Sequence, residues 1–289
     1  MPKDGNITKR QHYIPQVYLR GFSTNYQDAR RDLPSSKYNI YCYDLTGNNK
    51  IMDPVPIKSI CYEKYLYEIT DSDGGFLHIN HLEKFFSELE RRFGCYRSKL
   101  ERKVNIENNY KINCFLSTDE KLFWVTYISI QLLRIPQILK IAKETNLEIF
   151  GDKINEAQAK NMARMMCLPF WTKLEEGKKE VMVLEFIFKP MLNMSFRVGF
   201  DKKAGIITSD RPAIIKSGEF PCEEYTRVVF PVTAQICLFM FGKEERRVYP
   251  KNSLFLIGDE QRRDINRMVR KYAFKNIYSN HLLDENEIL

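Results

Sequence analysis

The sequence predicts an α+β fold, with a mixed or antiparallel sheet built from N- and C-terminal strands and a central layer of long helices. Segments with strand character occupy the first and last thirds of the 289 residues. Residues 77–191 instead show the three- and four-residue apolar spacing of amphipathic helices. Strands and helices do not alternate as they would in a parallel sheet, so we expect one domain over residues 1–289.

The composition is that of a globular protein, with 44% hydrophobic and 28% charged residues. Seven cysteines at irregular spacing, without a Cys-x-x-Cys pair, indicate reduced thiols and argue against a disulfide framework or a zinc ribbon. The start of the chain lacks a secretory signal, and the longest apolar stretch, Leu122–Leu133, is too short to cross a bilayer. We expect a cytoplasmic protein that is not inserted in a membrane.

The net charge of +8 favours an acidic partner, with nucleic acid as the first choice. Basic residues are concentrated at 91–103 and 262–275. Either cluster could follow a phosphate backbone. The alternative is that both are solvated helix faces without a ligand.

The N-terminal third begins with Gln11–Phe22, which reads QHYIPQVYLRGF. Because proline suits the first turn of a helix, Pro15 predicts a short helix over Pro15–Phe22 that follows an extended His12–Ile14. Asn25–Ser36 is polar and predicts a loop. Strands are predicted at Asn39–Asp44, in a short segment between the Thr46–Asn49 turn and Pro54, and at Tyr65–Ile69.

The central helices are marked by apolar periodicity and by capping residues. Leu77–Val104 carries an apolar stripe. Ser117 and Glu120 fit a capping box for a second helix that runs to Leu133, and Pro136 should kink or restart it. Further helical periodicity covers Asn155–Cys167 and Trp171–Met191.

The last third returns to short β-branched and apolar segments separated by turn residues. Strands are predicted at Met194–Phe200, Ala204–Thr208, Ala213–Ile215, Arg227–Phe230 and Gln235–Phe241. A basic helix over Asp259–Phe274 and an edge strand at Ile277–Ser279 complete the fold.

Several catalytic motifs are absent from the sequence: the Walker phosphate loop, the dinucleotide fingerprint and the Gly-x-Ser-x-Gly elbow. The one close histidine pair is His78 and His81. On a helix this spacing would let both rings bind a metal, but no third ligand is defined by spacing. Exposed polar residues at a helix start are the alternative, and we expect neither a metal nor a cofactor.

Two polar positions outside the N-terminal segment are candidates for a site. Asp210 follows a predicted strand and precedes a proline turn, where it either points into a cleft or caps the turn. Arg134 lies three residues after Gln131 in an otherwise apolar helix, so its burial requires an anion. That anion is a ligand phosphate, or a carboxylate such as Glu83, Glu90 or Asp210.

The N-terminal segment holds the densest mixture of polar and aromatic side chains. Gln16 and Arg20 share one face of the predicted helix, and His12 precedes it. Leu19 and Phe22 can anchor the helix in the core. Docking through these two residues alone, with the polar side in water, is the alternative, and it would not require His12.

The run His12-Tyr13-Ile14-Pro15-Gln16-x-Tyr18-Leu19-Arg20-x-Phe22 resembles the opening signature of the prokaryotic domain-of-unknown-function family 4238. Further features match in the same order: Lys58-Ser59-Ile60, Tyr67, Leu82-Glu83, Glu90, Gln131-x-x-Arg134-x-Pro136, Ser209-Asp210-x-Pro212, Phe230-Pro231 and Ile277-Tyr278-Ser279. One departure is Gln11, where many relatives are expected to carry a second histidine.

The resemblance implies antiviral defence and, through some relatives, DNA glycosylases that remove modified bases from phage DNA. For a metal-independent glycosylase, Asp210 would stabilise the oxocarbenium-like transition state, and His12 would act as acid or base. The remaining expected substrate-binding residues are Gln16 and Gln131 for a base edge, Tyr13 and Tyr18 for stacking, Arg20 and Arg134 for phosphates, and Ser209. A nuclease and a non-catalytic nucleic-acid-binding module are the alternatives.

Overall fold

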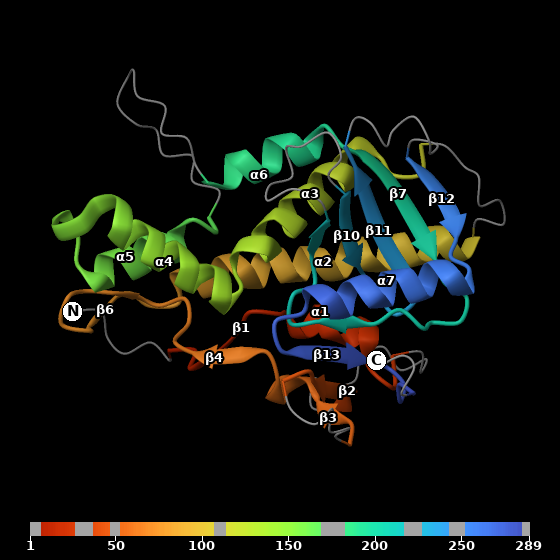
Figure 1. Ribbon diagram of the computed structural model, residues 1–289, viewed down its shortest axis with the longest axis horizontal. Helices are drawn as coiled ribbons and strands as arrows, with labels where there is room; N and C mark the ends of the chain where they lie inside the picture. Colours follow the sequence, from red (N-terminus) through yellow and green to blue (C-terminus); the bar gives the residue numbers. More distant parts are fainter. Residues whose placement is uncertain are drawn as a thin grey trace.

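The computed structural model describes residues 7–26, 37–46, 53–106, 114–168, 183–216, 227–242 and 252–284. Its architecture is α+β, as predicted: two main sheets built largely from the ends of the chain and a group of central helices (Figure 1). The long helices over residues 81–106 and 118–133 share a core with one face of the larger sheet.

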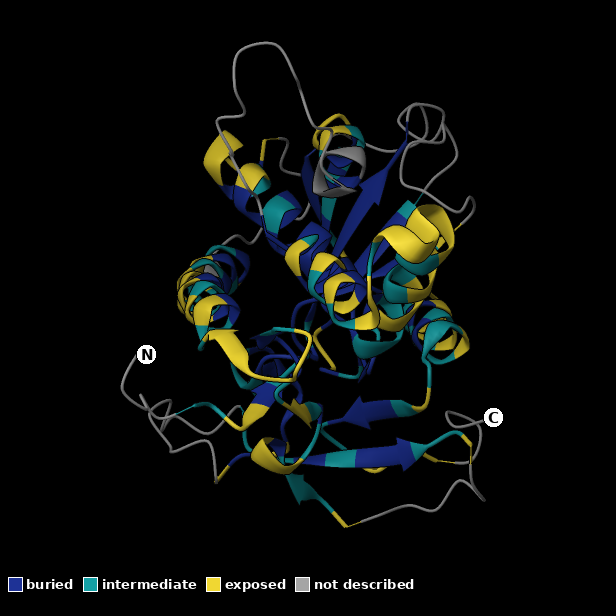
Figure 2. Cartoon of the chain, turned by 90° about the vertical axis from the view of Figure 1, so that its left-hand side faces the viewer, coloured by how far each residue is buried: buried dark blue, intermediate teal, exposed yellow. Residues whose placement is uncertain are grey.

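The larger sheet has five strands in the order β12-β7-β11-β10-β9. Their bounds are β7 (Ser195–Phe200), β9 (Ile214–Lys216), β10 (Arg227–Pro231), β11 (Ile236–Phe241) and β12 (Ser253–Leu256). All neighbours are antiparallel except β12 and β7, so the sheet is mixed. Figure 2 shows its strands buried almost throughout, whereas the surrounding helices expose their outer faces.

Both faces of this sheet are covered, and each faces a different core. Phe230 and Leu238 belong to the core formed with the central helices, which contains Trp124. Their neighbours Val229 and Phe239 belong to a second core formed with α7 (Asp259–Tyr272). Alternate side chains of a strand point to opposite faces, so strands covered on both sides read as continuous apolar runs.

The smaller sheet has the order β3-β2-β13-β8 and combines strands from both ends of the chain, as predicted. Its strands are β2 (Asn39–Asp44), β3 (Val55–Pro56), β8 (Thr208–Ser209) and β13 (Asn276–Ser279). The strand predicted at Ile277–Ser279 is confirmed as β13, but its predicted edge position was wrong, because β13 pairs with β2 on one side and β8 on the other.

The central helices are α2 (His81–Ile106), α3 (Thr118–Leu133), α4 (Pro136–Phe150), α5 (Glu156–Met165) and α6 (Val183–Leu192). The capping box at Ser117 is confirmed: Glu120 N donates to Ser117 Oγ over 3.2 Å, and Ser117 N donates to Glu120 Oε2 over 2.7 Å. Pro136 restarts the chain as α4. Residues 169–182, the first part of the predicted helix Trp171–Met191, lie outside the described residues.

Within the described segments, no single helix is both long and apolar enough to span a membrane. Only α3 taken together with 136–153 meets those criteria, and this pair is bent by 68°. Most residues of α3 are buried in the helical core.

The N-terminal segment forms β1 (Arg10–His12), α1 (Gln16–Leu19) and η1 (Arg20–Phe22). The chain continues through η3 (Ile57–Ser59), β4 (Tyr62–Lys64), β5 (Ile69–Thr70), β6 (Phe76–His78) and, after α4, η4 (Gly151–Lys153). β1 pairs antiparallel with β4. Leu19 and Phe22 are fully buried and dock α1 in the core, as the sequence predicts.

Two predicted strands were wrong for one physical reason. Tyr65–Ile69 is mostly a turn between β4 and β5, and Arg164 takes up the carbonyls of Tyr65, Leu66 and Glu68. In Ala204–Thr208 only Thr208 is in a strand, and the Asn266 side chain bonds the main chain of Gly205 and Ile207. Side chains distant in sequence therefore replace a neighbouring strand in both segments. β12 was not predicted, and His78 lies in β6 rather than in a helix.

Candidate functional site

Arg134 occupies the centre of a polar cluster between β1, α2 and the end of α3. It is 1% exposed, and its Nη1 and Nη2 each lie 3.1 Å from Glu90 Oε1. Nη2 also donates to the His12 carbonyl over 2.6 Å, and the guanidinium lies 4.1 Å from the centre of the Phe86 ring. Among the three carboxylates considered from the sequence, Glu90 is the one that pairs with Arg134.

The end of α3 positions this guanidinium. Arg134 is the C-cap residue, and Pro136 begins the next helix two residues later. The Tyr67 hydroxyl donates to the Arg134 carbonyl over 2.8 Å, and Arg134 Nε lies 3.3 Å from the same hydroxyl. One tyrosine thus holds both the main chain and the side chain of the helix end.

Glu83 and Glu90 form a carboxylate pair seven residues apart on α2. Burial raises the pKa of Glu83 to about 7, repulsion from Glu90 adds to that rise, and Arg134 opposes it. Burial also raises the pKa of Glu90, against the attraction of Arg134 with which it is paired. Near neutral pH, Glu83 is therefore a proton donor next to a carboxylate that carries an ion pair.

A groove brings Glu83 into contact with solvent. Its volume is about 430 Å³, and it lies between the N-terminal segment and the first turns of α2. The Thr8 amide donates to Asn80 Oδ1 over 2.9 Å and closes one side. The cationic side chains of Lys84 and Arg91 also line the groove.

His12 lies at the end of β1, with its ring centre 5.6 Å from that of Tyr62. Burial lowers the pKa of His12 to about 4; the Lys58 carbonyl opposes this shift, and Arg134 adds to it. The imidazole is therefore neutral at pH 7 and can accept a proton, but it cannot donate one as an imidazolium.

Three predicted residues present buried polar atoms without a hydrogen-bond partner in the part of the chain that the structure describes. These are His12 Nε2, Gln16 Oε1 and Gln131 Oε1. Gln16 Nε2 lies 3.4 Å from His12 Nδ1, and Gln131 Nε2 donates to the Tyr13 carbonyl over 2.9 Å. Buried polar atoms are rarely left unsatisfied, so these three are candidates for hydrogen bonds to water or to a ligand.

Gln11, where the sequence departs from the expected second histidine, is fully buried. Its Nε2 donates to Glu68 Oε1 over 2.5 Å, and its Oε1 accepts the Tyr67 amide over 2.7 Å. Glu68 Oε2 in turn accepts the Asn80 amide over 3.0 Å. Both the nitrogen and the oxygen of the Gln11 side-chain amide are bonded in this way, and they connect β1 to the segment that leads into α2.

The two tyrosines of the N-terminal segment differ in environment. Tyr13 is half-buried, and burial together with the nearby Cys61 and Asp210 raises the pKa of its hydroxyl. Tyr18 is 1% exposed, its hydroxyl lies 2.6 Å from Thr208 Oγ1, and it donates to the Pro231 carbonyl over 2.9 Å. Phenylalanines surround its ring, which leaves no face for a nucleic-acid base.

Asp210 does not join the Arg134 cluster through any hydrogen bond or ion pair of the described residues. Its two oxygens accept the amides of Phe274, Lys275 and Asn276 over 2.9, 2.8 and 3.0 Å. Burial raises the pKa of this carboxyl, and the same amides oppose the rise. Asp210 is therefore a cap, but on the distant connection between α7 and β13 rather than on its own turn, where the sequence placed the cap.

The contacts described for Ser209 and Arg20 are with residues other than Arg134. Ser209 Oγ donates to the Arg211 carbonyl over 3.0 Å and accepts the Arg211 amide over 3.1 Å. The Arg20 guanidinium lies 5.2 Å from the centre of the Tyr38 ring. Both contacts are local packing or turn contacts.

The histidine pair is not arranged on one helix. His78 is on β6 and His81 begins α2, with ring centres 6.2 Å apart and both residues exposed. Within the described ranges, no group of three or more His, Cys, Asp or Glu side chains is placed to hold a metal ion.

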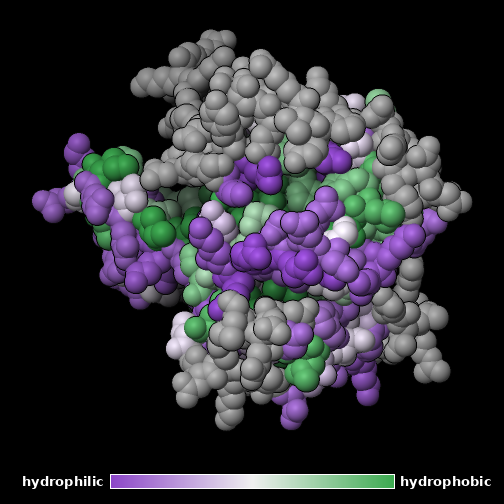
Figure 3. Space-filling model, turned by 45° about the vertical axis from the view of Figure 1, so that its right-hand side comes forward, coloured by the Kyte–Doolittle hydropathy of each residue, from purple (hydrophilic) through white to green (hydrophobic). Residues whose placement is uncertain are grey.

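The basic clusters are partly neutralised inside the protein. Arg91 pairs with Glu88 at 2.7 Å, Lys103 with Glu120 at 2.8 Å, and Arg262 with Asp201 at 3.3 Å. Figure 3 shows a hydrophilic band across the face on which α7 lies. Ion pairing and solvation account for a large part of both clusters.

Glu83 was not predicted as a site residue in its own right: the sequence suggested it only as a possible partner of Arg134 and as part of the family resemblance. The signal that identifies it is an acid on the apolar stripe of α2, beside the buried Leu82 and Phe86. An acid on such a stripe must be paired, protonated or functional.

Comparison with known proteins agrees with the resemblance stated above. The family model described as "Protein of unknown function (DUF4238)" matches residues 10–281. No curated protein and no solved structure matches the chain. The matched range includes β1, the whole Arg134 cluster and β13, and the chain therefore belongs to the DUF4238 family.

Proposed function

We propose that this protein is a metal-independent DNA glycosylase that excises a modified base in cytoplasmic antiviral defence. The observation that supports this most is the Glu83–Glu90 pair, in which one carboxyl has a pKa of about 7. Arg134, which pairs with Glu90, also bonds the carbonyl of the neutral His12. Glycosidic bonds are usually cleaved by a pair of carboxyl groups, one protonated and the other ionised. The family resemblance supplies the choice of DNA.

Each group has a distinct task in this proposal. Protonated Glu83 donates its proton to the departing base as the C1′–N bond breaks. Glu90, ionised beside Arg134, stabilises the positive charge that develops on the sugar. His12 accepts a proton from the water whose oxygen bonds to C1′, and exchange with solvent returns both residues to their starting states.

In this proposal Glu83 and Glu90 supply the catalytic carboxyl groups, a role that the sequence predicted for Asp210. Both oxygens of Asp210 are already occupied by main-chain amides. The unpartnered amide oxygens of Gln16 and Gln131 would accept hydrogen bonds from the edge of an extruded base. Lys84 and Arg91 at the groove would contact the flanking phosphates.

The test is incubation of the protein with normal and modified phage DNA, followed by measurement of released bases, abasic sites and strand breaks. Glu83→Gln should reduce base release by about 10²–10⁴-fold. The matched control is Glu88→Gln, an exposed carboxylate of the same groove, which should keep most of the activity.

Absence of base release from every DNA, or full activity of Glu83→Gln, would refute the proposal. Strand breaks without released bases, lost in chelator and restored by magnesium, would identify a nuclease instead. DNA binding without any cleavage, abolished by substitutions in the basic helices, would identify a binding module.

A further inference from the structure

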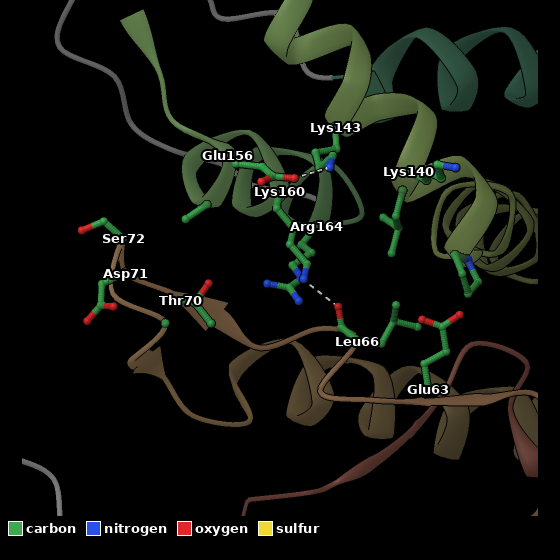
Figure 4. Close-up of a pocket in the computed structure, with 14 residues that line it drawn as sticks. Glu63, Leu66, Thr70, Asp71, Ser72, Lys140, Lys143, Glu156, Lys160 and Arg164 are labelled. Carbon is green, nitrogen blue, oxygen red and sulfur yellow. Dashed lines mark hydrogen bonds and ion pairs between the residues drawn. The ribbon is translucent and has the colours of Figure 1, made fainter. Parts of the chain in front are cut away.

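A second cavity of about 520 Å³ lies between the 63–74 segment and the hairpin of α4 and α5 (Figure 4). Four cationic side chains line it: Lys140, Lys143, Lys160 and Arg164. Figure 4 shows Arg164 in the middle of the cavity, extending from α5 toward the segment at Leu66. None of these residues belongs to the Glu83 groove, so the cavity can be considered independently of the proposed glycosylase activity.

Arg164 supplies a fixed positive charge. It is 3% exposed, and its Nε and Nη2 donate to the carbonyls of Leu66 and Tyr65 over 2.7 and 3.1 Å, while Nη1 donates to the Glu68 carbonyl. Burial lowers its pKa to about 10, so it stays charged at neutral pH. In the described parts of the chain no carboxylate forms an ion pair with it; the three carbonyls bond it directly, and the Glu68 carboxylate attracts it without a direct contact.

Two of the acids that line the cavity are already engaged. Glu156 pairs with Lys143 at 2.7 Å. Asp71 accepts the amides of Asp73 and Gly75 over 3.0 and 2.7 Å, which directs its charge to its own turn. Glu63 remains as the carboxylate that faces the other cations.

Lys160 lies close to the other cations of the cavity. Burial lowers its pKa, Arg164 and Lys143 lower it further, and Glu156 and Glu63 oppose that shift. Lys140 lies on the adjacent helix, exposed, with Glu144 3.9 Å away. Two lysines that are not held in close ion pairs therefore stand beside one immobile guanidinium, and each offers three N–H donors.

We propose that this cavity binds the phosphate group of a nucleotide, with Lys140 and Lys160 as contacts and Arg164 as the fixed charge behind them. The volume is within the usual range for small-ligand sites, about 300–1,000 Å³. Leu66, Pro136 and Leu139 give the cavity an apolar wall for a sugar or base, and Glu63 offers an acceptor for hydroxyl or amino groups. A free nucleotide and a nucleotide within a strand share this chemistry.

The experiment is calorimetric titration of the full chain with inorganic phosphate, adenosine monophosphate, a single-stranded oligonucleotide and, as the probe without phosphate, adenosine. The Lys140→Gln/Lys160→Gln double variant should weaken phosphate-dependent binding at least tenfold and leave folding intact, because both side chains are exposed. Lys153→Gln, an exposed lysine of the same hairpin outside the cavity, is the matched control and should bind as the parent does.

Binding of adenosine monophosphate that is lost in the double variant identifies a free nucleotide, and binding of the oligonucleotide alone with the same loss identifies a strand. Either result supports the phosphate site. No binding by any phosphate-bearing probe, or equal binding by the double variant and the parent, overturns it. The assay requires no catalysis, so its outcome is separate from that of the base-release assay.

Discussion

At the scale of single residues, Arg134 determines how the candidate site is assembled. Burying a guanidinium and a carboxylate costs several kcal/mol per ion before their attraction is counted. Here Glu90, the His12 carbonyl and the Phe86 ring together offset that cost. The pair is therefore expected to be sensitive to the loss of either member.

Arg134→Met should lower the free energy of unfolding by about 3–5 kcal/mol, because it leaves Glu90 without its cation. Glu90→Gln should also destabilise, by a smaller amount since about a quarter of that side chain is exposed (26%). Urea unfolding of both single variants and of the double variant measures the coupling. Additive effects would show that the ion pair contributes nothing specific.

Glu83 predicts a pH dependence of stability. Its folded-state pKa of about 7 lies above the ordinary value of 4.5, so the folded protein holds this proton more tightly than the unfolded chain does. The stabilisation is complete below pH 4.5 and is lost as the pH rises to about 7. Partial exposure of the side chain reduces the effect to about 1–2 kcal/mol.

Glu83→Gln should remove this loss, so the variant should gain stability relative to the parent between about pH 5 and about pH 8. Denaturant titrations at several pH values measure the difference, with the exposed Glu148→Gln as control. A parent and a Glu83→Gln variant with parallel pH profiles would contradict the raised pKa.

Sequence reasoning succeeded for residues whose requirements are local. The cost of burying Arg134 predicted an anionic partner, and the structure selected Glu90 from the three carboxylates considered. The role of Asp210 as a cap was harder to predict, because the amides that donate to it lie 64 to 66 residues away in the sequence. The pKa of Glu83 depends on burial by segments from other parts of the chain and has no local signature.

At the scale of elements, two glycines show how packing decides the effect of one added methyl group. A Cβ at Gly94 on α2 would lie 3.5 Å from Val17 Cγ2, an ordinary contact. A Cβ at Gly199 on β7 would lie 2.6 Å from Ile257 Cδ1 and 2.9 Å from Phe239 Cε2. β7 passes close to the second core at this point and has no room for a side chain.

Gly94→Ala should stabilise the protein by about 0.5–1 kcal/mol, because alanine favours a helix interior. Gly199→Ala should destabilise it by about 1–3 kcal/mol through overpacking. Thermal unfolding of the two variants checks both signs at once. Equal effects of the two substitutions would contradict the packing described for β7.

Asp210→Asn tests the connection between α7 and β13. Asparagine has one acceptor oxygen in place of two, so at least one partly buried amide of 274–276 loses its partner, at about 1–3 kcal/mol each. We expect lower stability and nearly unchanged base release below the unfolding temperature. Loss of base release by Asp210→Asn at the stability of the parent would instead indicate that Asp210 is catalytic.

Elements whose ends are marked in the sequence by capping residues or proline were predicted well. The Ser117 capping box and Pro136 define α3 and α4, and the NIYCYD run is β2 from its first residue to its last. Elements defined by distant partners were not. Tyr65–Ile69 has strand composition, yet Arg164 on α5 bonds its carbonyls, and this contact across nearly 100 residues has no sequence pattern.

At the scale of the molecule, β10 and β11 belong to both cores, because their alternate side chains face α2 and α3 on one side and α7 on the other. The smaller sheet joins β2 to β13 across more than 230 residues. The sequence indicated that strands from both ends share a sheet, but it contained no sign that a second sheet would form from C-terminal strands alone.

This shared construction predicts cooperative unfolding. Amides of Ile128 on α3 and of Tyr278 on β13, which lie in different elements but are both buried, should exchange with solvent at nearly the same free energy. Native-state hydrogen exchange at increasing denaturant measures it. Exchange of Tyr278 at a free energy several kcal/mol lower would indicate that the smaller sheet opens independently.

The position of β13 between β2 and β8 also has a consequence for synthesis on the ribosome. β2 is translated before its partner strand Asn276–Ser279, and more than 230 residues separate the two. At ordinary translation rates of about 5–20 residues per second, the apolar side of β2 therefore waits more than ten seconds for that partner. The nascent chain is expected to require chaperone protection during this interval, more than a protein of similar size whose sheets close locally.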